Sequence, residues 1–144
     1  MNIAIGGDHA GFEYKNRLIE FINNTLSYST KDFGPFSNLS VDYPDYVHPL
    51  CTQLVRGEFD FGIVICGSGN GVAITANKHC HIRAALCFNV EVAQLARCHN
   101  DANVCAIPAR FLSYPEVESI VNIFLSSEFE GGRHSARVDK IAKF

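Results

Sequence analysis

Cys66 stands where an apolar run meets a glycine-rich stretch, in the sequence IVICGSGNG at positions 63–71. The apolar run is typical of a buried strand, and the glycines are typical of a loop that opens a helix. A helix N-terminus favours the thiolate form of a nearby cysteine, and a thiolate can move protons. We therefore take Cys66 as the best candidate for a reactive thiol among six cysteines. The alternative is an inert thiol packed in the core.

The loop after Cys66 differs from two common phosphate-binding motifs. Its glycines, Gly67, Gly69 and Gly71, miss the dinucleotide fingerprint by one residue. The earlier GGDHAG stretch has Phe12 where a P-loop requires lysine. Clustered backbone N–H groups at a helix start still suit a phosphate or an oxyanion, and Ser68 adds a hydroxyl. A tight turn that requires positive φ is the alternative.

Other polar residues are expected at the ends of elements. His99 falls on the apolar face of a predicted helix, beside Asn100 and just before a buried strand, so it is either a core histidine or a site residue. Asp8 and His9 follow the first strand, where they could also simply cap a helix. Arg133 and Arg137 share a helical face, which suits a phosphate dianion or plain solvation.

Short apolar runs alternate with helical patterns along the chain. This alternation predicts one domain, residues 1–144, with a parallel sheet covered on both faces. Ligands bind such sheets at the carboxyl ends of strands, and we expect every candidate loop at such an end. Pro49 suggests a late start for the second helix, and Ser113 with Glu116 predicts a capping box. The strands are expected at 2–6, 27–33, 61–66, 83–87 and 103–108, and the helices at 12–23, up to 56, 70–79, 89–99, after 113 and from about 133.

Composition excludes several classes of protein. A net charge of −3 argues against nucleic-acid binding through a general basic field. The start of the chain shows no signal-peptide pattern and no apolar run reaches membrane-spanning length, so we expect a cytoplasmic protein with free thiols and no membrane association. The lack of a Cys-x-x-Cys pair weakens redox and zinc interpretations, and a metal at His79 and His81 is not expected.

Taken together, the candidates include a base, a hydroxyl that relays protons, an oxyanion cradle, histidines and phosphate-binding arginines. This combination is typical of an aldose–ketose isomerase that acts on a sugar phosphate through an enediolate.

The segments GGDHAGF, VDYPDY, ICGSGNGVAITANK, RCHNDANV and EGGRHSARV together resemble the type B ribose-5-phosphate isomerases. The resemblance runs in order from the first strand to the last helix. It implies a Rossmann-like three-layer fold, no cofactor or metal, and a homodimer or homotetramer with active sites between subunits. The implied reaction interconverts ribose 5-phosphate and ribulose 5-phosphate in the pentose phosphate pathway.

The resemblance also implies a role for each matched residue. Cys66 would be the base, Ser68 the proton relay, and the amides of Gly67, Ser68, Gly69, Asn70 and Gly71 would hold the enediolate. His99 with Asp8 would open the sugar ring, while Asn100 and Tyr43 contact the sugar. The phosphate would be held by His9, Arg110, Arg133 and Arg137, with His99, Asn100 and Arg110 supplied by the partner subunit.

Two positions depart from the family pattern. Ser68 replaces a common threonine and keeps the hydroxyl, and Val72 stands where some members carry a glutamate base, which leaves the base role to Cys66. A hexose 6-phosphate isomerase (galactose or allose) and a non-catalytic phosphosugar-binding protein are the remaining alternatives.

Overall fold

The computed structural model of the protein describes residues 1–141, in which five parallel strands form a sheet with the order β2-β1-β3-β5-β4. The prediction of an α/β fold with a five-stranded parallel sheet is confirmed. The strands are β1 (Asn2–Gly7), β2 (Ser29–Asp32), β3 (Phe61–Cys66), β4 (Ala84–Leu86) and β5 (Val104–Pro108).

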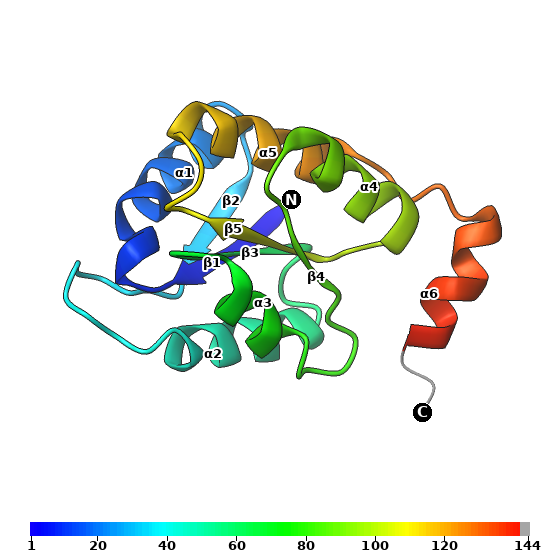
Figure 1. The fold of residues 1–144 in the computed structure, drawn as a ribbon, viewed down its shortest axis with the longest axis horizontal. Helices are drawn as coiled ribbons and strands as arrows, with labels where there is room; N and C mark the ends of the chain where they lie inside the picture. Colours follow the sequence, from blue (N-terminus) through cyan, green and yellow to red (C-terminus); the bar gives the residue numbers. More distant parts are fainter. Residues whose placement is uncertain (142–144) are drawn as a thin grey trace.

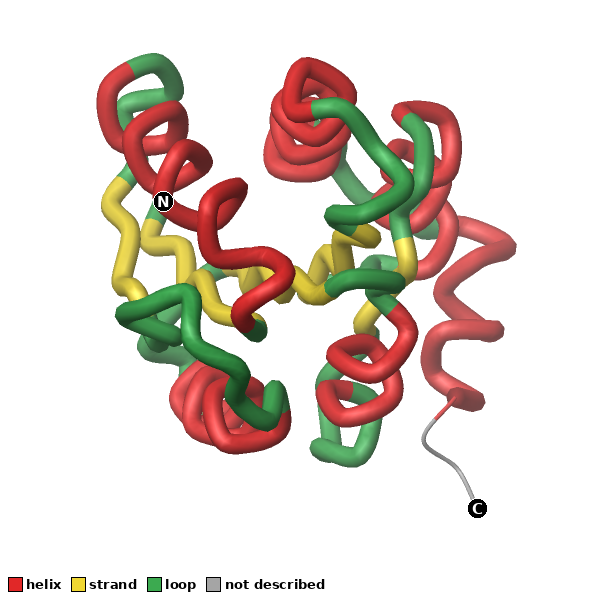
Figure 2. The backbone as a smooth tube through the Cα atoms, turned by 60° about the vertical axis from the view of Figure 1, so that its left-hand side comes forward, coloured by secondary structure: helices red, strands yellow, loops and turns green. Residues whose placement is uncertain are grey.

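Helices cover both faces of the sheet and make three layers (Figure 1). One face is covered by α1 (Phe12–Asn24), α4 (Val90–Asn100) and α5 (Tyr114–Ser126), and the other by α2 (Pro44–Val55) and α3 (Asn70–Ala76). Figure 2 shows the sheet between the two helical layers. The 3₁₀ turn η1 (His9–Gly11) precedes α1, while η2 (Gly132–His134) and α6 (Ser135–Ile141) end the described chain.

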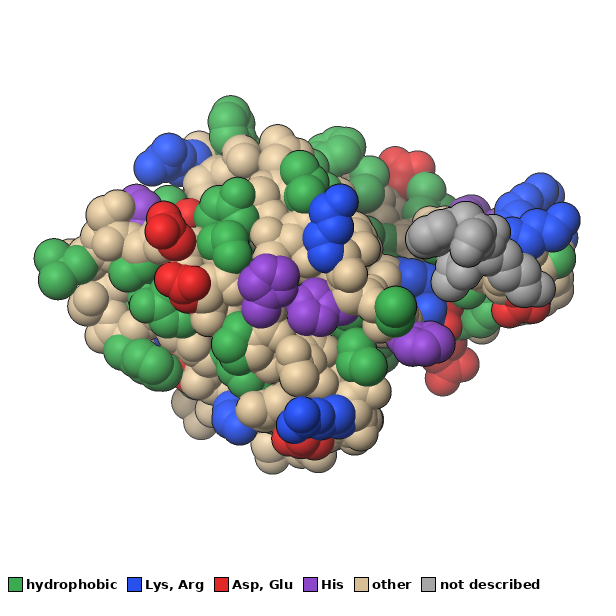
Figure 3. Space-filling model, turned by 90° about the horizontal axis from the view of Figure 1, so that it is seen from below, with side chains coloured by type: hydrophobic (Ala, Val, Ile, Leu, Met, Phe, Trp, Pro, Cys, Tyr) green, Lys and Arg blue, Asp and Glu red, His purple; other side chains and the backbone are tan. Residues whose placement is uncertain are grey.

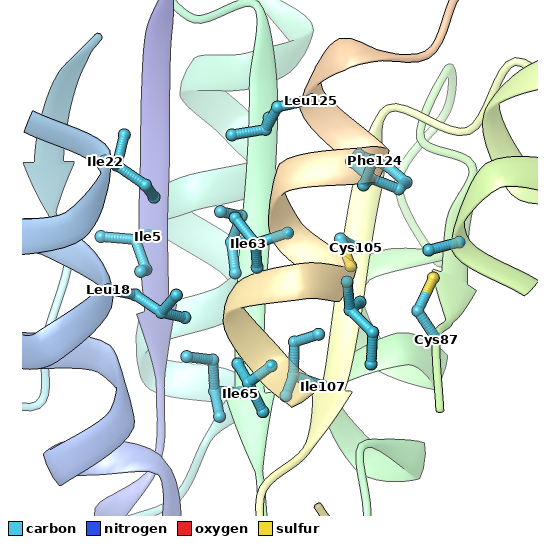
Figure 4. Close-up of a cluster of buried hydrophobic side chains, with 14 of the residues drawn as sticks. Ile5, Leu18, Ile22, Ile63, Ile65, Cys87, Cys105, Ile107, Phe124 and Leu125 are labelled. Carbon is cyan, nitrogen blue, oxygen red and sulfur yellow. The ribbon is translucent and has the colours of Figure 1, made fainter. Parts of the chain in front are cut away.

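The core follows from the alternation of side chains along buried strands. Ile63 and Ile65 of β3 point to the α1/α5 side, where they meet Leu18 and Leu125, as Figure 4 shows. Val64 lies between them in sequence and packs with the α2/α3 cluster on the opposite face. Because both faces of the central strands are fully buried, this framework holds the strand ends in fixed positions.

Two helix boundaries differ from prediction. α2 begins at Pro44 and contains Pro49, so the expected late start was wrong. Pro44 occupies the first turn, where no N–H partner is required, and burial of Val47 and Leu50 offsets the hydrogen bond that Pro49 lacks. α3 ends at Ala76 rather than at residue 79. Beyond Ala76 the backbone hydrogen bonds join residues three apart, as in a 3₁₀ turn, and the His79 N–H donates to the Ala76 carbonyl at 3.1 Å.

The buried face of α4 also differs from prediction. The helical pattern placed Leu95 and His99 on the apolar face, but the structure buries Ala93, Ala96 and Arg97. The Arg97 guanidinium lies 4.7 Å from the centre of the Phe61 ring, so this long side chain fills the place expected for an apolar one. Leu95 is 40% exposed and His99 is only partly buried, which leaves His99 accessible.

Other local predictions are confirmed. Glu116 accepts hydrogen bonds from the Ser113 backbone N–H at 2.8 Å and from its hydroxyl at 2.6 Å. The hydroxyl and backbone N–H of Ser113 hold the pKa of the Glu116 carboxyl below its usual range. Within residues 1–141, every helix is too short or too polar to cross a bilayer.

Candidate active site

Three neighbouring strands deliver polar residues to one pocket at the carboxyl edge of the sheet. Asp8 follows β1, Cys66 ends β3, and Arg110 follows β5. Because β1, β3 and β5 are adjacent and parallel, the loops after them meet. The pocket has a volume of about 390 Å³ and is lined by Asp8, Tyr43, Cys66, Gly67, Ser68, Gly71, Arg110 and Phe111. We call this group the carboxyl-edge pocket.

The Cys66 thiol is held against the start of α3. It is 4% exposed, and the Gly69 backbone N–H donates a hydrogen bond to Sγ at 3.2 Å. Sγ therefore lies beside the backbone N–H groups at the N-terminal end of α3. Cys51 has a different environment, since burial alone raises the pKa of its thiol to about 12. Cys66, which lines the carboxyl-edge pocket, therefore remains the candidate base.

Gly69 shapes the loop after Cys66. Its φ of 72° lies in the left-handed region, and a Cβ there would come within 2.3 Å of Leu86 Cδ1. The turn that requires positive φ at Gly69 is thus the same turn that presents backbone N–H donors. Gly71 admits the Tyr43 ring, because a Cβ at Gly71 would lie 2.5 Å from Tyr43 Cζ.

Ser68 places its side chain at the mouth of the pocket. The residue is exposed, and its Oγ accepts only a long hydrogen bond, 3.4 Å from the Asn70 backbone N–H. The hydroxyl therefore remains free to exchange protons with a bound molecule.

Asp8 and His9 have separate surroundings. Asp8 Oδ1 caps η1 by accepting from the Ala10 N–H at 2.9 Å, so the capping interpretation holds, and the residue also lines the carboxyl-edge pocket. The Nδ1 of His9 accepts a hydrogen bond from the Val41 N–H at 3.3 Å. His9 lines a neighbouring cavity of about 530 Å³ together with Asn38 and Arg17.

Arg110 belongs to the same pocket as the Cys66 of its own chain. Its Cδ, Nε and Cζ lie 3.2 Å from the position that a Cβ would take at Gly67. The implied contribution of Arg110 by a partner subunit is therefore corrected. The physical reason is that β5 pairs with β3, so the turn after Pro108 passes directly beside Gly67.

His99 and Asn100 lie at the opposite edge of the sheet. They end α4 just before β5 begins, and Asn100 lines a groove with residues that precede or begin β4, including Arg83 and Ala84. The expectation that every candidate loop sits at a carboxyl strand end was wrong for these two residues. A helix that directly precedes a parallel strand must end at the amino edge of the sheet, because the strand begins there.

The His99 ring stacks on the His134 ring, with centroids 4.1 Å apart and planes 8° apart. Glu130 lies beside both, its Oε2 3.7 Å from His99 Nε2 and 3.9 Å from His134 Nε2. Burial and the charges of His99, Arg133 and Arg137 lower the pKa of His134, while Glu130 opposes the shift. We call this set, with Asn100, Arg133 and Arg137, the amino-edge group.

Arg133 and Arg137 are exposed and lie beyond the sheet. Arg133 lies in η2 and Arg137 in α6, which projects from the body of the molecule in Figure 1. Figure 3 shows Lys and Arg side chains gathered at this end. Neither arginine lines the carboxyl-edge pocket. A strand as long as the six-residue β3 spans roughly 20 Å, which keeps the two groups apart within one chain.

Sequence reasoning missed three residues near these groups. Phe111 lines the carboxyl-edge pocket and is 75% exposed, and nothing in the pattern of the sequence marked it. Glu130 and His134 lie within the quoted segment EGGRHSARV, so their position next to Arg133 was a usable signal.

The fold and the sequence both match known isomerases. The family described as Ribose/Galactose Isomerase matches residues 3–141. A ribose-5-phosphate isomerase B of Escherichia coli is 40% identical over 139 residues, covering 96% of this chain and 93% of the relative. A putative sugar phosphate isomerase of Rickettsia bellii is 41% identical over 140 residues, covering 97% and 96%.

Solved structures agree with this assignment over nearly the whole length. A ribose-5-phosphate isomerase B from Clostridium thermocellum has a TM-score of 0.97 at 44% identity, covering 99% of this chain and 96% of that chain. A ribose 5-phosphate isomerase from Thermotoga maritima has a TM-score of 0.96 at 42% identity, covering 99% and 98%. Its sequence, its fold and its pocket at the carboxyl strand ends place the chain in the ribose/galactose isomerase family, and the protein is an isomerase.

Proposed function

We propose that the protein interconverts ribose 5-phosphate and ribulose 5-phosphate through a cis-enediolate, with Cys66 as the base. The observation that carries this proposal is the Cys66 thiol itself, which ends β3 at a pocket and accepts a hydrogen bond from Gly69. The E. coli relative named ribose-5-phosphate isomerase B supports the choice of substrate.

The proposed proton transfers use two residues that line the pocket, Cys66 and Ser68. In the open-chain aldose, the Cys66 thiolate removes the proton from C2, and the electron pair forms the C1–C2 double bond. The Ser68 hydroxyl passes a proton from O2 to O1, which Ser68 is suited to do because its Oγ is exposed. The Cys66 thiol then returns its proton to C1 and produces the ketose.

Backbone donors stabilise the charge that develops on the enediolate. The amides from Gly67 to Gly71 surround the start of α3, where the helix dipole is positive. Asp8 and Tyr43 line the same pocket and are placed to contact sugar hydroxyls. Donors fixed by a buried strand need no rearrangement when charge develops, which is the condition for an effective oxyanion site.

A complete site requires a second copy of the chain. His99 is assigned to ring opening, with help from Asp8, and Arg133 and Arg137 to the phosphate, yet both functions lie at the amino edge while Cys66 lies at the carboxyl edge. We propose a dimer with two-fold symmetry in which the amino-edge group of one subunit faces the carboxyl-edge pocket of the other. His99 and Asn100 then come from the partner, while His9 and Arg110 join the phosphate site from the chain that carries Cys66.

The proposal is tested by assaying purified protein with ribose 5-phosphate in the presence of a metal chelator. We expect ribulose 5-phosphate to form, at a rate that the chelator does not change. Galactose 6-phosphate and allose 6-phosphate are assayed in parallel. Turnover of either hexose phosphate with none of the pentose phosphate contradicts the substrate assignment, and no turnover of any of the three contradicts the reaction.

A further inference from the structure

We propose that a buried ion pair between Lys15 and Asp32 positions the loop 33–43, which delivers Tyr43 to the carboxyl-edge pocket. Lys15 lies on α1 and is 1% exposed, and its Nζ forms an ion pair with Asp32 Oδ2 at the end of β2. Both residues lie outside the carboxyl-edge pocket, so the pair acts through the loop and not by touching substrate. The effect on substrate binding rests on the proposed function.

Asp32 ties the start of the loop to the ion pair. While its Oδ2 faces Lys15, its Oδ1 accepts a hydrogen bond from the Gly34 backbone N–H at 2.8 Å. The Gly34 carbonyl in turn accepts from the Gly7 backbone N–H at 3.0 Å, which links the loop to the end of β1. The φ of Gly34 is 99°, a conformation that favours glycine. The carboxylate thus joins α1 to the first residues of the loop.

Lys15 makes a second contact with the loop. Its Nζ lies 5.9 Å from the centre of the Phe36 ring and 5.6 Å from that of Phe12, within the range of a cation–π interaction. Phe36 is 74% exposed, so apolar packing contributes little to holding its ring. The loop runs along the outside of the molecule between β2 and α2, at the left of Figure 1. The ammonium group therefore helps to hold the outer part of the loop.

The far end of the loop reaches residues assigned to substrate binding. The Val41 backbone N–H donates to His9 Nδ1 at 3.3 Å, which orients the imidazole ring. Tyr43 lines the carboxyl-edge pocket, and its ring occupies the space beside Gly71. Residues 36–40 are all exposed, so the position of the loop depends on how its ends are held. Release of the first end should therefore shift Tyr43 and His9.

The energetics of buried ion pairs favour a role beyond stability. Burial of a charge costs free energy that the attraction within the pair only partly returns, and apolar residues of similar size are often equally stabilising in such a place. An apolar pair lacks direction, however. A carboxylate fixed by a cation presents its second oxygen to the Gly34 N–H in one orientation, which is what a loop anchor requires.

The first test replaces the ion pair by apolar side chains, in the double variant Lys15→Met with Asp32→Leu. We expect its Tm to stay within about 5 °C of the wild type, because no buried charge is left without a partner. KM for ribose 5-phosphate should rise by about tenfold or more, since the loop supplies contacts to the sugar and orients His9. The kcat should change by less than about threefold, because Cys66 is held by β3 and α3.

Limited proteolysis with chymotrypsin reports on the loop without an assay of turnover. Phe36 and Leu39 are exposed cleavage sites within the loop, and Phe88 is an exposed site outside it. Cleavage in the loop should be about tenfold faster in the double variant, because release of the anchor favours local opening. Cleavage at Phe88, identified by the masses of the fragments, should keep its rate and serves as the internal control.

Lys31→Met is the matched control for loss of a lysine. Lys31 precedes Asp32 on β2 and is exposed, and its Nζ donates to Gln53 Oε1 at 2.8 Å. This variant removes the same charge and keeps the buried pair, so KM and loop cleavage should stay at the wild-type values. Lys15→Met alone is the second variant, since the Asp32 side chain is 27% exposed and tolerates loss of its partner. It should raise both KM and loop cleavage by about threefold, and it decides the test if the double variant does not fold.

Unchanged KM and unchanged loop cleavage in a folded variant of Lys15 would overturn the proposal. A fall in kcat at constant KM, or equal effects in Lys31→Met, would overturn it as well. Absence of turnover in the wild type contradicts the proposed function alone, because cleavage within the loop then decides whether the ion pair holds it.

Discussion

The two edges of the sheet carry candidate residues in different physical settings. At the carboxyl edge, Cys66 is 4% exposed and held by a backbone hydrogen bond from a glycine turn. At the amino edge, Glu130 is 58% exposed and Arg133 and Arg137 stand on a projecting turn and helix. The first setting suits a base that must be positioned closely, and the second supplies charges that reach outward.

This difference has a consequence for assembly. The carboxyl-edge pocket contains the proposed base and one arginine, Arg110, whereas Arg133 and Arg137 lie outside this pocket. Under the proposed function, the two groups would complete each other only between two chains. The contrast therefore predicts that damage at one edge can be rescued by an intact copy of that edge on another subunit.

Loss of Cys66 should produce the largest effect. Cys66→Ala removes the proposed base, and Val72 cannot take a proton in its place. General acid–base groups contribute about 10²–10⁴-fold, so we expect turnover to fall by that factor. Turnover of ribose 5-phosphate is measured beside binding of inorganic phosphate, which should persist. Cys80→Ser, at an exposed thiol, is the matched control and should keep full activity. More than a tenth of wild-type turnover in Cys66→Ala would remove Cys66 from the base role.

Mixing two inactive variants tests the separation of the edges directly. Cys66→Ala and His99→Asn are each expected to be inactive, but a mixed dimer contains one site with an intact Cys66 and an intact His99. Random exchange in an equal mixture should restore about a quarter of wild-type activity, since half of the dimers are mixed and each has one good site. Activity is measured after unfolding and refolding the variants together and separately. If refolding together gives no more activity than refolding separately, both groups must act within one chain.

Removing one arginine from the amino edge should have an intermediate effect. A charge-assisted hydrogen bond contributes roughly 1.5–3 kcal/mol, so Arg137→Ala should raise KM for ribose 5-phosphate by about 10–100-fold. Inorganic phosphate should also inhibit the variant less than the wild type. Lys140→Ala, on the same short helix, serves as the control for a general loss of charge. Equal KM values in both variants and the wild type would mean that the phosphate is held elsewhere.

The smallest effect is expected from a histidine pair outside both edge groups. Burial, and then the nearby His48, lower the pKa of His79. The folded state therefore binds fewer protons than the unfolded state, and stability is lost as pH falls below the ordinary imidazole range of about 6.5. His79→Gln should reduce the fall in Tm between about pH 7 and 5 by about 1–2 °C, without changing turnover. A steeper fall in the variant would contradict the assigned direction of the shift.

Local patterns in the sequence were sufficient to predict most elements. The strands β1, β3 and β5 follow from short apolar runs, because strands buried on both faces need no alternation. Cys66, Ser68 and Asp8 were placed correctly at strand ends, since a strand end and the glycines after it are read from adjacent residues. The roles given to these residues stay predictions.

Other features were set by contacts between residues far apart in the sequence. Packing against the sheet decided that α2 continues through Pro49, and the Phe61 ring decided that Arg97 rather than His99 lies on the buried side of α4. The stack of His99 on His134 joins two segments that no local pattern connects. Helical spacing alone assigns a face to each residue but does not say which neighbour covers that face.

The sequence by itself determined the alternation of strands and helices, the glycine turn after Cys66 and the types of residue available for chemistry. Those properties depend on backbone preferences and on side chains that are close along the chain. Only the tertiary structure decided that Arg110 shares a pocket with Cys66 and that His99 lies at the other edge. The order of strands in the sheet sets which loops meet, and that order results from the packing of the whole core.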